Sequence, residues 1–327
     1  MHTSNSATQH TSGIRPNSCG ICKQSAGFLL RENFKEYSLW HCPRCDGQFW
    51  FPMQNPGAQW YAHDDRYAFR NRNPLRSPER THRAFLADRP AAGGRLLDVG
   101  TGTGNFLVAA RAAGYRAVGT DFDLDAVKTA TEQFGLSVYP LDLAGVTARF
   151  GKESFDVITL FEVLEHLEAP RTFLDEVGAL LAPGGYLAIT VPYRGCPAFL
   201  KPHDLPPRHL TRWNETAMEN LLTAAGFSMI RLRRIPLPFS YLITKFHFWT
   251  KGFFSFGAVQ RFSRGAQTPG QRGAPREKTI ATMQLLARIK DYALFTIPAA
   301  LLYGGLLLLG RRHLGLYALA RRYPEGP

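Results

Sequence analysis

Short apolar runs and amphipathic helical patterns alternate along the chain from residue 94 onwards. The apolar runs predict seven strands, at Leu96–Val99, Ala117–Thr120, Ser137–Leu141, Phe155–Leu160, Tyr186–Val191, Met229–Ile235 and Leu316–Ala320. Helices are expected at Ser77–Asp88 (with Ser77 as its cap), Phe106–Ala113, Leu124–Phe134 and Glu215–Ala225. Strands that alternate with helices form parallel sheets with right-handed crossovers, so the pattern predicts a doubly wound α/β fold.

Three alternate glycines separate the first predicted strand from the helix that follows it. Gly100, Gly102 and Gly104 have no Cβ, so this loop can turn sharply and let a ligand approach its backbone. The next helix presents free N–H groups to that ligand. Asp98 comes just before the loop, and Asp121 ends the second strand, where a parallel sheet places a carboxylate near a ribose. The loop therefore predicts a cofactor site.

The motif Asp98-x-Gly100-x-Gly102-x-Gly104, followed by Asp121, resembles that of class I S-adenosylmethionine-dependent methyltransferases. The resemblance implies a Rossmann-like sheet of seven strands and S-adenosyl-L-methionine as the cofactor. Asp98 and the glycines would hold the methionine moiety, and Asp121 the ribose. The further residues implied to contact the cofactor, mostly around its adenine, are Phe122, Asp142, Leu143 and Phe161. Asp142 has an alternative role as a helix cap.

Two acids and a histidine follow the fourth predicted strand, where open α/β sheets place their sites. If the chain turns helical at Phe161, then Glu162, Glu165 and His166 share one helical face. Such a face can bind Mg²⁺ or Mn²⁺, or let His166 act as a base that Glu165 orients. The run resembles a Val-Leu-Glu-His methyltransferase subgroup, some of whose quinone-precursor and small-RNA O-methyltransferases hold a metal ion here. The alternative is that the acids only cap the helix and hydrogen-bond the cofactor loop.

The long loop after the fifth predicted strand carries a second candidate base. It contains Pro206-Pro207-Arg208-His209 and is too long and proline-rich for a plain connection. Similar methyltransferases have such a stretch over the mouth of the active site, which implies that His209 acts as a base and that Arg208 contacts an anion. A solvated loop histidine is the alternative.

Two Cys-x-x-Cys pairs lie near the start of the chain. Cys19 and Cys22 are separated from Cys42 and Cys45 by the nineteen residues 23–41, a spacing typical of a four-cysteine zinc site. Four thiolates leave no open position on a tetrahedral Zn²⁺, so we expect a structural zinc ribbon around a hairpin. Redox-active pairs and iron in place of zinc are the alternatives, and His41 is a substitute ligand.

The composition narrows the class of protein but not its partner. The chain has 327 residues, of which 45% are hydrophobic, and this excludes a disordered protein. Its formal net charge of +13 favours binding to nucleic acid, to acidic substrates or to an anionic membrane surface. Residues 1–18 lack the zones of a signal peptide, so we expect a disordered tail and a cytoplasmic protein.

An insertion that a minimal methyltransferase does not need precedes the last strand. Residues 239–262 mix aromatic and basic side chains, as do helices in a membrane interface, and Tyr292–Gly310 has no charged residue. Pro298 allows a break, and the last strand has to return to the sheet. We therefore expect peripheral attachment to the cytoplasmic face of the membrane. A soluble cap over the active site and a spanning helix are the alternatives.

These features predict six segments and one activity. The segments are a disordered tail (1–18), a zinc ribbon (19–50), a linker in which Tyr61 or Tyr67 is a lid candidate (51–76), a methyltransferase domain (77–238), the insertion (239–312) and the last strand with its tail (313–327). The predicted activity is methylation, at oxygen, of a small-molecule or lipid-like acceptor. An RNA methyltransferase is less favoured, because the basic residues lie among aromatics, and a non-catalytic S-adenosylmethionine-binding scaffold is the other alternative. The oligomeric state is not predicted.

Overall fold

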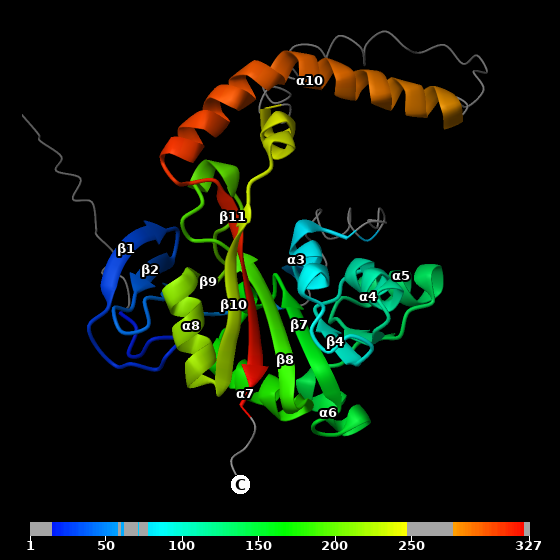
Figure 1. The fold of residues 1–327 in the computed structure, drawn as a ribbon. Coiled ribbons are helices and arrows are strands. Elements are labelled where there is room, and N and C mark those ends of the chain that lie inside the picture. Colours follow the sequence, from blue (N-terminus) through cyan, green and yellow to red (C-terminus); the bar gives the residue numbers. More distant parts are fainter. Residues whose placement is uncertain (1–14, 58–59, 62–70, 72–77, 247–276, 324–327) are drawn as a thin grey trace, which may run out of the picture. The chain divides into compact units, whose positions relative to one another are not determined.

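The structure of the chain is a computed structural model that describes residues 15–57, 60–61, 71, 78–246 and 277–323. It divides into two compact units. The first comprises Met1–Ile235 with Leu314–Pro327, and the second is Pro236–His313 (Figure 1). Tyr67, Ser77 and most of the basic aromatic segment of the predicted insertion lie outside the described residues.

A seven-stranded sheet forms the centre of the first unit, as predicted. Its strands, in the order in which they lie side by side, are β10 (Phe227–Pro236), β11 (His313–Arg322), β8 (Leu181–Pro192), β7 (Phe155–Phe161), β4 (Arg95–Val99), β5 (Arg116–Thr120) and β6 (Val138–Tyr139). β4 pairs in parallel with β5 and β7, and β7 with β8, whereas β11 is antiparallel to β8. The strand order reverses beside β4, so the carboxyl ends of β4 and β7 form the edge where such sheets bind ligands.

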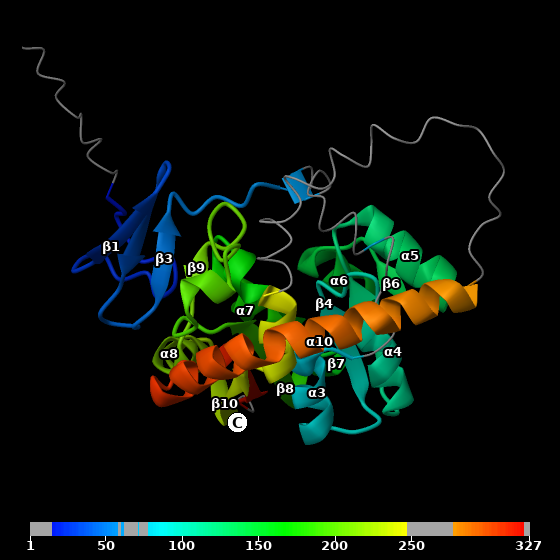
Figure 2. The same cartoon turned by 90° about the horizontal axis from the view of Figure 1, so that it is seen from above.

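Helices cover both faces of this sheet, because successive strand residues point to opposite sides. Leu96 belongs to a buried cluster with residues of α3 (Arg80–Asp88), α4 (Asn105–Ala112) and α5 (Leu124–Phe134). Its neighbour Leu97 belongs to another cluster, with residues of α6 (Leu143–Phe150), α7 (Pro170–Leu180) and α8 (Glu215–Ala224). The sheet is therefore enclosed between two layers of helices (Figure 2).

Several predicted elements differ in extent from those observed. α3 begins at Arg80, because Glu79 occupies the N-cap position and forms a capping box with the His82 side chain. The third predicted strand, Ser137–Leu141, is reduced to the two residues of β6, which pair only with β5 at the edge of the sheet. The predicted helix Leu124–Phe134 coincides with α5, whose end is set by Gly135 in the left-handed conformation.

A smaller four-stranded sheet contains the cysteine-rich segment. Its strands lie in the order β1 (Leu29–Phe34), β2 (Tyr37–His41), β3 (Gln48–Phe51) and β9 (Thr211–Arg212). β1 and β2 form the predicted hairpin, and β3 extends it on the other side of β2. β9 belongs to the loop that follows β8, so this sheet joins two segments far apart in the sequence.

The second unit contains the long helix α10 (Glu277–Leu308), which is continuous through Pro298, where the sequence allows a break. Within this unit, Phe239 lies 5.9 Å from Tyr303 and Phe246 lies 6.3 Å from Phe295, measured between ring centroids. Among the residues that the structure describes, no helix combines the length and the apolar content needed to cross a membrane.

Candidate active site

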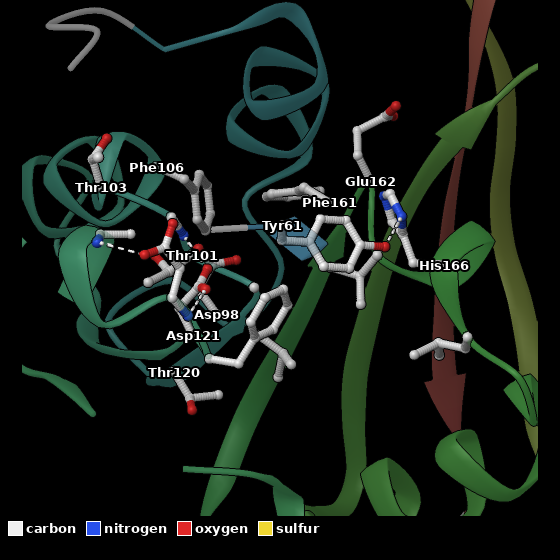
Figure 3. Close-up of a pocket in the computed structure, with 18 of the residues that line it drawn as sticks. Tyr61, Asp98, Thr101, Thr103, Phe106, Thr120, Asp121, Phe161, Glu162 and His166 are labelled. Carbon is white, nitrogen blue, oxygen red and sulfur yellow. Dashed lines mark hydrogen bonds between the residues drawn. The ribbon is translucent and has the colours of Figure 1, made fainter. Parts of the chain in front are cut away.

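A cavity of about 1000 Å³ lies at the carboxyl ends of β4, β5 and β7 (Figure 3). The glycine loop after β4 forms one part of its lining, and the acids and histidines after β7 form another. Cavities of this size accommodate ligands as large as a cofactor. The tertiary structure thus brings together the two clusters that the sequence singled out.

The glycine loop needs its glycines for backbone conformation and for space. Gly100, Gly102 and Gly104 have φ angles of 72°, 55° and 81°, in the left-handed region that side chains disfavour. A Cβ on Gly104 would lie 2.2 Å from Cδ1 of Leu136, whereas a Cβ on Gly102 would meet nothing within 4 Å. Gly104 is therefore required for packing, and the backbone at Gly102 is open to the cavity.

Two carboxylates hold this loop in place. Asp98 is buried at the end of β4 and accepts a 2.6 Å hydrogen bond from Oγ1 of Thr159, yet burial raises the pKa of its carboxyl to about 7. Asp121 follows β5 and accepts hydrogen bonds from the N–H groups of Gly102 (2.7 Å) and Asp123 (2.9 Å). Both carboxylates line the cavity.

The other residues expected near the cofactor also line the cavity, in different environments. Asp142 caps α6 by accepting a hydrogen bond from the N–H of Gly145 (2.8 Å), so the alternative role as a helix cap is observed beside its place at the cavity. Leu143 and Phe161 are buried, whereas Phe122 is 54% exposed. An exposed ring at a cavity wall is free area against which a ligand can stack.

The predicted helical face after β7 is wrong. Phe161 ends the strand, Glu162 has a φ of 57°, and only Leu164–His166 forms a short 3₁₀ turn (η1). The three residues do not lie on one helix, because a left-handed residue breaks the helical repeat between the strand and the turn. The carboxyl of Glu165 is instead fully buried, and burial raises its pKa well above the ordinary value.

His209 completes the cluster that the helix was expected to build. Nε2 of His166 lies 3.9 Å and Nε2 of His209 lies 4.0 Å from Oε1 of Glu165. The three residues can offer one ligand atom each within 4.8 Å of one another, a grouping that does not include Glu162. Glu162 lines the same cavity, and burial raises the pKa of its carboxyl.

Hydrogen bonds on the far side of each imidazole fix which nitrogen faces Glu165. Nδ1 of His209 lies 2.7 Å from Oδ1 of Asp204, and Nδ1 of His166 lies 2.7 Å from the carbonyl oxygen of Arg208. Both acceptors require a proton on Nδ1, so each neutral ring keeps the lone pair of Nε2 on the side of Glu165. Burial by itself raises the pKa of Asp204, but the hydrogen bond from His209, together with nearby positive charge that includes Lys201 and Arg212, outweighs burial and holds that pKa below its ordinary value.

The sequence analysis did not predict two contacts of this cluster, those of Asp204 with His209 and of Tyr61 with His166. Asp204 stands five residues before His209 in the same loop, and this closeness in sequence could have indicated their contact. The hydroxyl of Tyr61, a lid candidate, lies 3.2 Å from Nδ1 of His166 (Figure 3). The ring centroid of Tyr61 lies 5.3 Å from that of Phe122. Tyr61 therefore touches both parts of the cavity lining.

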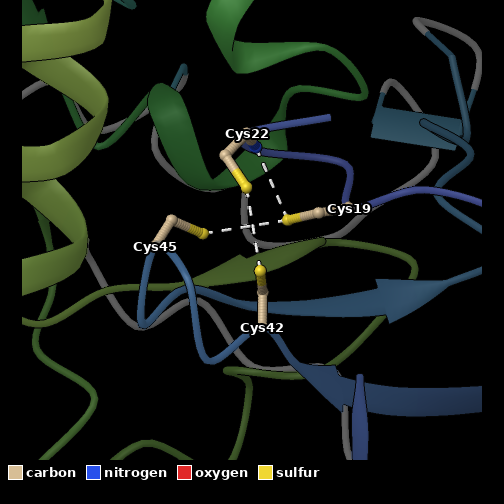
Figure 4. A group of neighbouring side chains, drawn as sticks. All are labelled: Cys19, Cys22, Cys42 and Cys45. Carbon is tan, nitrogen blue, oxygen red and sulfur yellow. Dashed lines mark hydrogen bonds between the residues drawn. The ribbon is translucent and has the colours of Figure 1, made fainter. Parts of the chain in front are cut away.

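The four cysteines of the small sheet form a separate cluster (Figure 4). Sγ of Cys19 lies 3.8 Å from that of Cys45, and Sγ of Cys22 lies 3.7 Å from that of Cys42. The hydrogen bond with Cys45 lowers the pKa of the Cys19 thiol to about 5. His41 is not part of this cluster, because its ring bonds to Arg31 and Asp46.

Comparison with curated proteins finds similarity to enzymes named as O-methyltransferases. The chain is 29% identical over 152 residues to "Ubiquinone biosynthesis O-methyltransferase" of Maricaulis maris. This alignment covers 43% of the present chain and 60% of that protein. It is 38% identical over 102 residues to the protein of that name from Ruegeria pomeroyi, covering 30% and 41%. The matched part thus spans about half the length of these relatives.

Comparisons of structure and of family agree on the fold. A SAM-dependent methyltransferase from Archaeoglobus fulgidus superimposes with a TM-score of 0.50 at 15% identity, covering 79% of this chain and all of that one. The family described as "Methyltransferase domain" matches residues 62–232, more than half of the chain. With its Rossmann-like sheet and the glycine loop at the carboxyl edge, the chain belongs to this family of methyltransferase domains.

Proposed function

We propose that this chain is an S-adenosyl-L-methionine-dependent methyltransferase that methylates an oxygen of a small-molecule or lipid-like acceptor. One observation carries the proposal: a single cavity joins the glycine loop and its two acids to the cluster of Glu165, His166 and His209. The names of the similar curated proteins support methylation at oxygen.

The residues around the glycine loop fit this cofactor. The buried carboxylate of Asp98 is bonded by the neutral hydroxyl of Thr159 and not by a cation. It can therefore pair with the positively charged ammonium group of a methionine moiety. The side-chain amide nitrogen of Asn105 lines the cavity, is buried, and has no hydrogen-bond partner among the described residues, as expected of a donor reserved for a ligand. Asp121 would accept from the ribose hydroxyls, and the exposed ring of Phe122 would stack against the adenine.

The cluster after β7 fits the activation of a hydroxyl. When bound, the cofactor supplies a methyl group on a positively charged sulfur, which an oxygen nucleophile can take once it loses its proton. His209 is oriented to accept that proton at Nε2, with its other nitrogen held by Asp204. Alternatively, Glu165, His166 and His209 hold Mg²⁺ or Mn²⁺, with Glu162 nearby. The two roles exclude each other at His209, because the same lone pair would serve both.

Transfer of labelled methyl groups tests this proposal. The purified full chain is incubated with methyl-labelled S-adenosylmethionine and with lipid, small-molecule or RNA extracts, in chelator and again with Mg²⁺ or Mn²⁺. We expect label in the lipid or small-molecule fraction. Full activity in chelator would remove the metal role. Salt-sensitive labelling of RNA would contradict the acceptor class, and cofactor binding without transfer to any fraction would contradict the activity.

The cysteine cluster is suited to a structural Zn²⁺. Ligands about 2.3 Å from a tetrahedral Zn²⁺ lie about 3.8 Å apart, close to the two distances between the paired sulfurs. The N–H groups of Ile21 and Cys22 point at the sulfur of Cys19, at 3.4 and 3.5 Å, and favour its thiolate. All four positions of the ion would be filled by protein, which leaves none for chemistry.

The exposed side of α10 supports peripheral attachment to an anionic membrane. Leu294, Ile297, Leu301 and Leu308 are 62%, 71%, 75% and 90% exposed. Their spacing of three, four and seven residues places them on one stripe of the helix. The exposed Arg311 and Arg312 follow the helix, where they can contact lipid phosphates. A lipid-like acceptor would then be methylated at the surface in which it is dissolved.

Flotation with vesicles tests this attachment. We expect the full chain to float with vesicles that contain an anionic phospholipid and much less with neutral ones. Leu301→Glu is expected to reduce the bound fraction about tenfold, because a buried leucine contributes roughly 1.5–3 kcal/mol. The matched control is Ile230→Glu, which changes an exposed apolar residue of β10. Equal recovery of wild type and Leu301→Glu with the vesicles would contradict the role of this stripe.

A further inference from the structure

We infer that the four-cysteine ribbon, Cys19–Phe51, positions the candidate base His209, and that Arg212 is the side chain through which it does so. The role of His209 as a base in this inference rests on the proposed function. The structural part of the inference, that the loop 204–212 depends on the ribbon, does not rest on the proposed function. Three sets of contacts carry it: a backbone joint, a side-chain relay and the packing that ties the cysteines to both.

The backbone joint is the pairing of β3 with β9. Gln48 pairs with Arg212 and Phe49 with Thr211, and the N–H of Trp50 donates a 2.8 Å hydrogen bond to the carbonyl of Leu210. The N–H of Leu210 in turn donates a 2.7 Å hydrogen bond to the carbonyl of Glu165. The residue that follows His209 is therefore held between the ribbon and the turn that carries Glu165.

The side-chain relay runs through Arg212. Its guanidinium lies 3.0 Å from Oε1 of Glu32 in β1 and 5.1 Å from the ring centroid of Trp50 in β3, so two ribbon residues fix its position. Nη2 of Arg212 donates a 3.2 Å hydrogen bond to the carbonyl of Asp204. The carboxylate of Asp204 holds Nδ1 of His209. Arg212 thus supports the residue that sets the orientation of the imidazole.

The cysteine cluster helps to fix the position of β3, because Cys42 and Cys45 lie in the turn that leads into this strand. The N–H of Cys42 bonds to the carbonyl of Gly47, at 3.0 Å, and a Cβ on Gly47 would lie 2.4 Å from Cδ1 of Ile21 in the other cysteine pair. The cysteines share a buried cluster with Phe49 of β3 and with Trp213, the residue after β9. Separation of the two cysteine pairs would therefore displace β3, and with it the support of β9.

A second anchor fixes the ribbon to the same region without touching His209. Asp46, between the last cysteine and β3, accepts hydrogen bonds from Nη2 of Arg194 (3.1 Å) and from the side-chain amide of Asn214 (2.6 Å). The side-chain amide of Asn220 in α8 donates to the carbonyl of Cys45. The ribbon has its own attachment to the first unit, so loss of Arg212 should disturb the loop and leave the ribbon in place.

Arg212→Ala in the full chain tests the relay. Because a displacement of about 1 Å at a reacting group can cost up to 10²-fold in rate, we expect kcat to fall at least tenfold. The KM for S-adenosylmethionine and the Kd for S-adenosylhomocysteine should stay within about twofold, since the glycine loop makes none of these contacts. Arg212→Lys should recover part of kcat. Arg44→Ala, which removes an exposed ribbon arginine bonded to Gln24, is the control expected to leave kcat unchanged.

Amide hydrogen exchange tests the same inference without any activity. After removal of Zn²⁺ with a chelator, or in Cys42→Ser, we expect peptides that cover 204–213 to exchange several-fold faster, while peptides over β4 and β5 keep their protection. Unchanged exchange at 204–213 would overturn the inference, as would an unchanged kcat in Arg212→Ala. If all peptides lose protection together, the ribbon stabilises the whole unit and has no particular role at His209. If the wild-type chain transfers no methyl group but its 204–213 peptides still exchange faster after loss of Zn²⁺, only the proposed function would be contradicted.

Discussion

Replacing His209 by alanine is expected to slow methyl transfer by about 10²- to 10⁴-fold, the range over which a positioned acid or base accelerates a reaction. The imidazole is bonded at Nδ1 to Asp204, so its Nε2 lone pair is available in the cavity as a base or as a metal ligand. Alanine removes both roles. The expected measurement is a loss in kcat at saturating cofactor, with the Kd for S-adenosylhomocysteine unchanged.

His203→Ala is the matched control for this variant. His203 is an exposed histidine of the same loop and is absent from the lining of the cavity, so its replacement should change kcat by less than about twofold. If His209→Ala retained a rate within about threefold of wild type, neither the base nor the metal role of this histidine would stand. The acceptor would then lose its proton to another group of the cluster, such as His166, or bind in an already ionised form.

Replacing Asp121 by alanine is expected to weaken cofactor binding by about 100-fold or more. Two hydrogen bonds from ribose hydroxyls to a carboxylate contribute roughly 1.5–3 kcal/mol each. The N–H groups of Gly102 and Asp123, which donate to this carboxylate, would also lose their acceptor. Titration calorimetry with S-adenosylhomocysteine measures the loss directly and requires no acceptor.

Asp125→Ala provides the control for Asp121. Asp125 is an exposed acid in the first turn of α5, close in sequence and outside the lining of the cavity. Its replacement removes one negative charge from the same region, so an effect of net charge would appear in both variants. Thermal unfolding followed by circular dichroism checks that Asp121→Ala is folded. A folded Asp121→Ala with wild-type affinity would show that this acid does not hold the ribose.

The part of the cavity around the glycine loop could be located from local sequence, since its residues are close to one another along the chain. Asp98 and the glycines occupy a single strand-to-helix turn, and Asp121 ends the next strand. Parallel pairing of β4 with β5 places these residues at one edge without further information. The part around Glu165, His166 and His209 was predicted less well, because it depends on the backbone at Glu162 and on the loop after β8, which carries His209.

The cluster after β7 shows why the local pattern was insufficient there. The spacing of Glu162, Glu165 and His166 is that of a helical face, but the chain leaves the strand through a left-handed residue and makes only the short turn η1. His209 then supplies the third side chain from the loop after β8. Periodicity reports neighbours within one element, and it contains no information on which loop will lie against that element.

The sequence by itself determined the alternating α/β pattern, the seven strands, the glycine turn and the pairing of the cysteines into one cluster, because each depends on neighbours in the chain or on strand periodicity. Only the tertiary structure decided that Glu165 meets His209 and that β3 of the ribbon pairs with β9 beside it. These contacts join residues far apart in sequence, and they form because burial of the shared core brings the ribbon and the loop after β8 together.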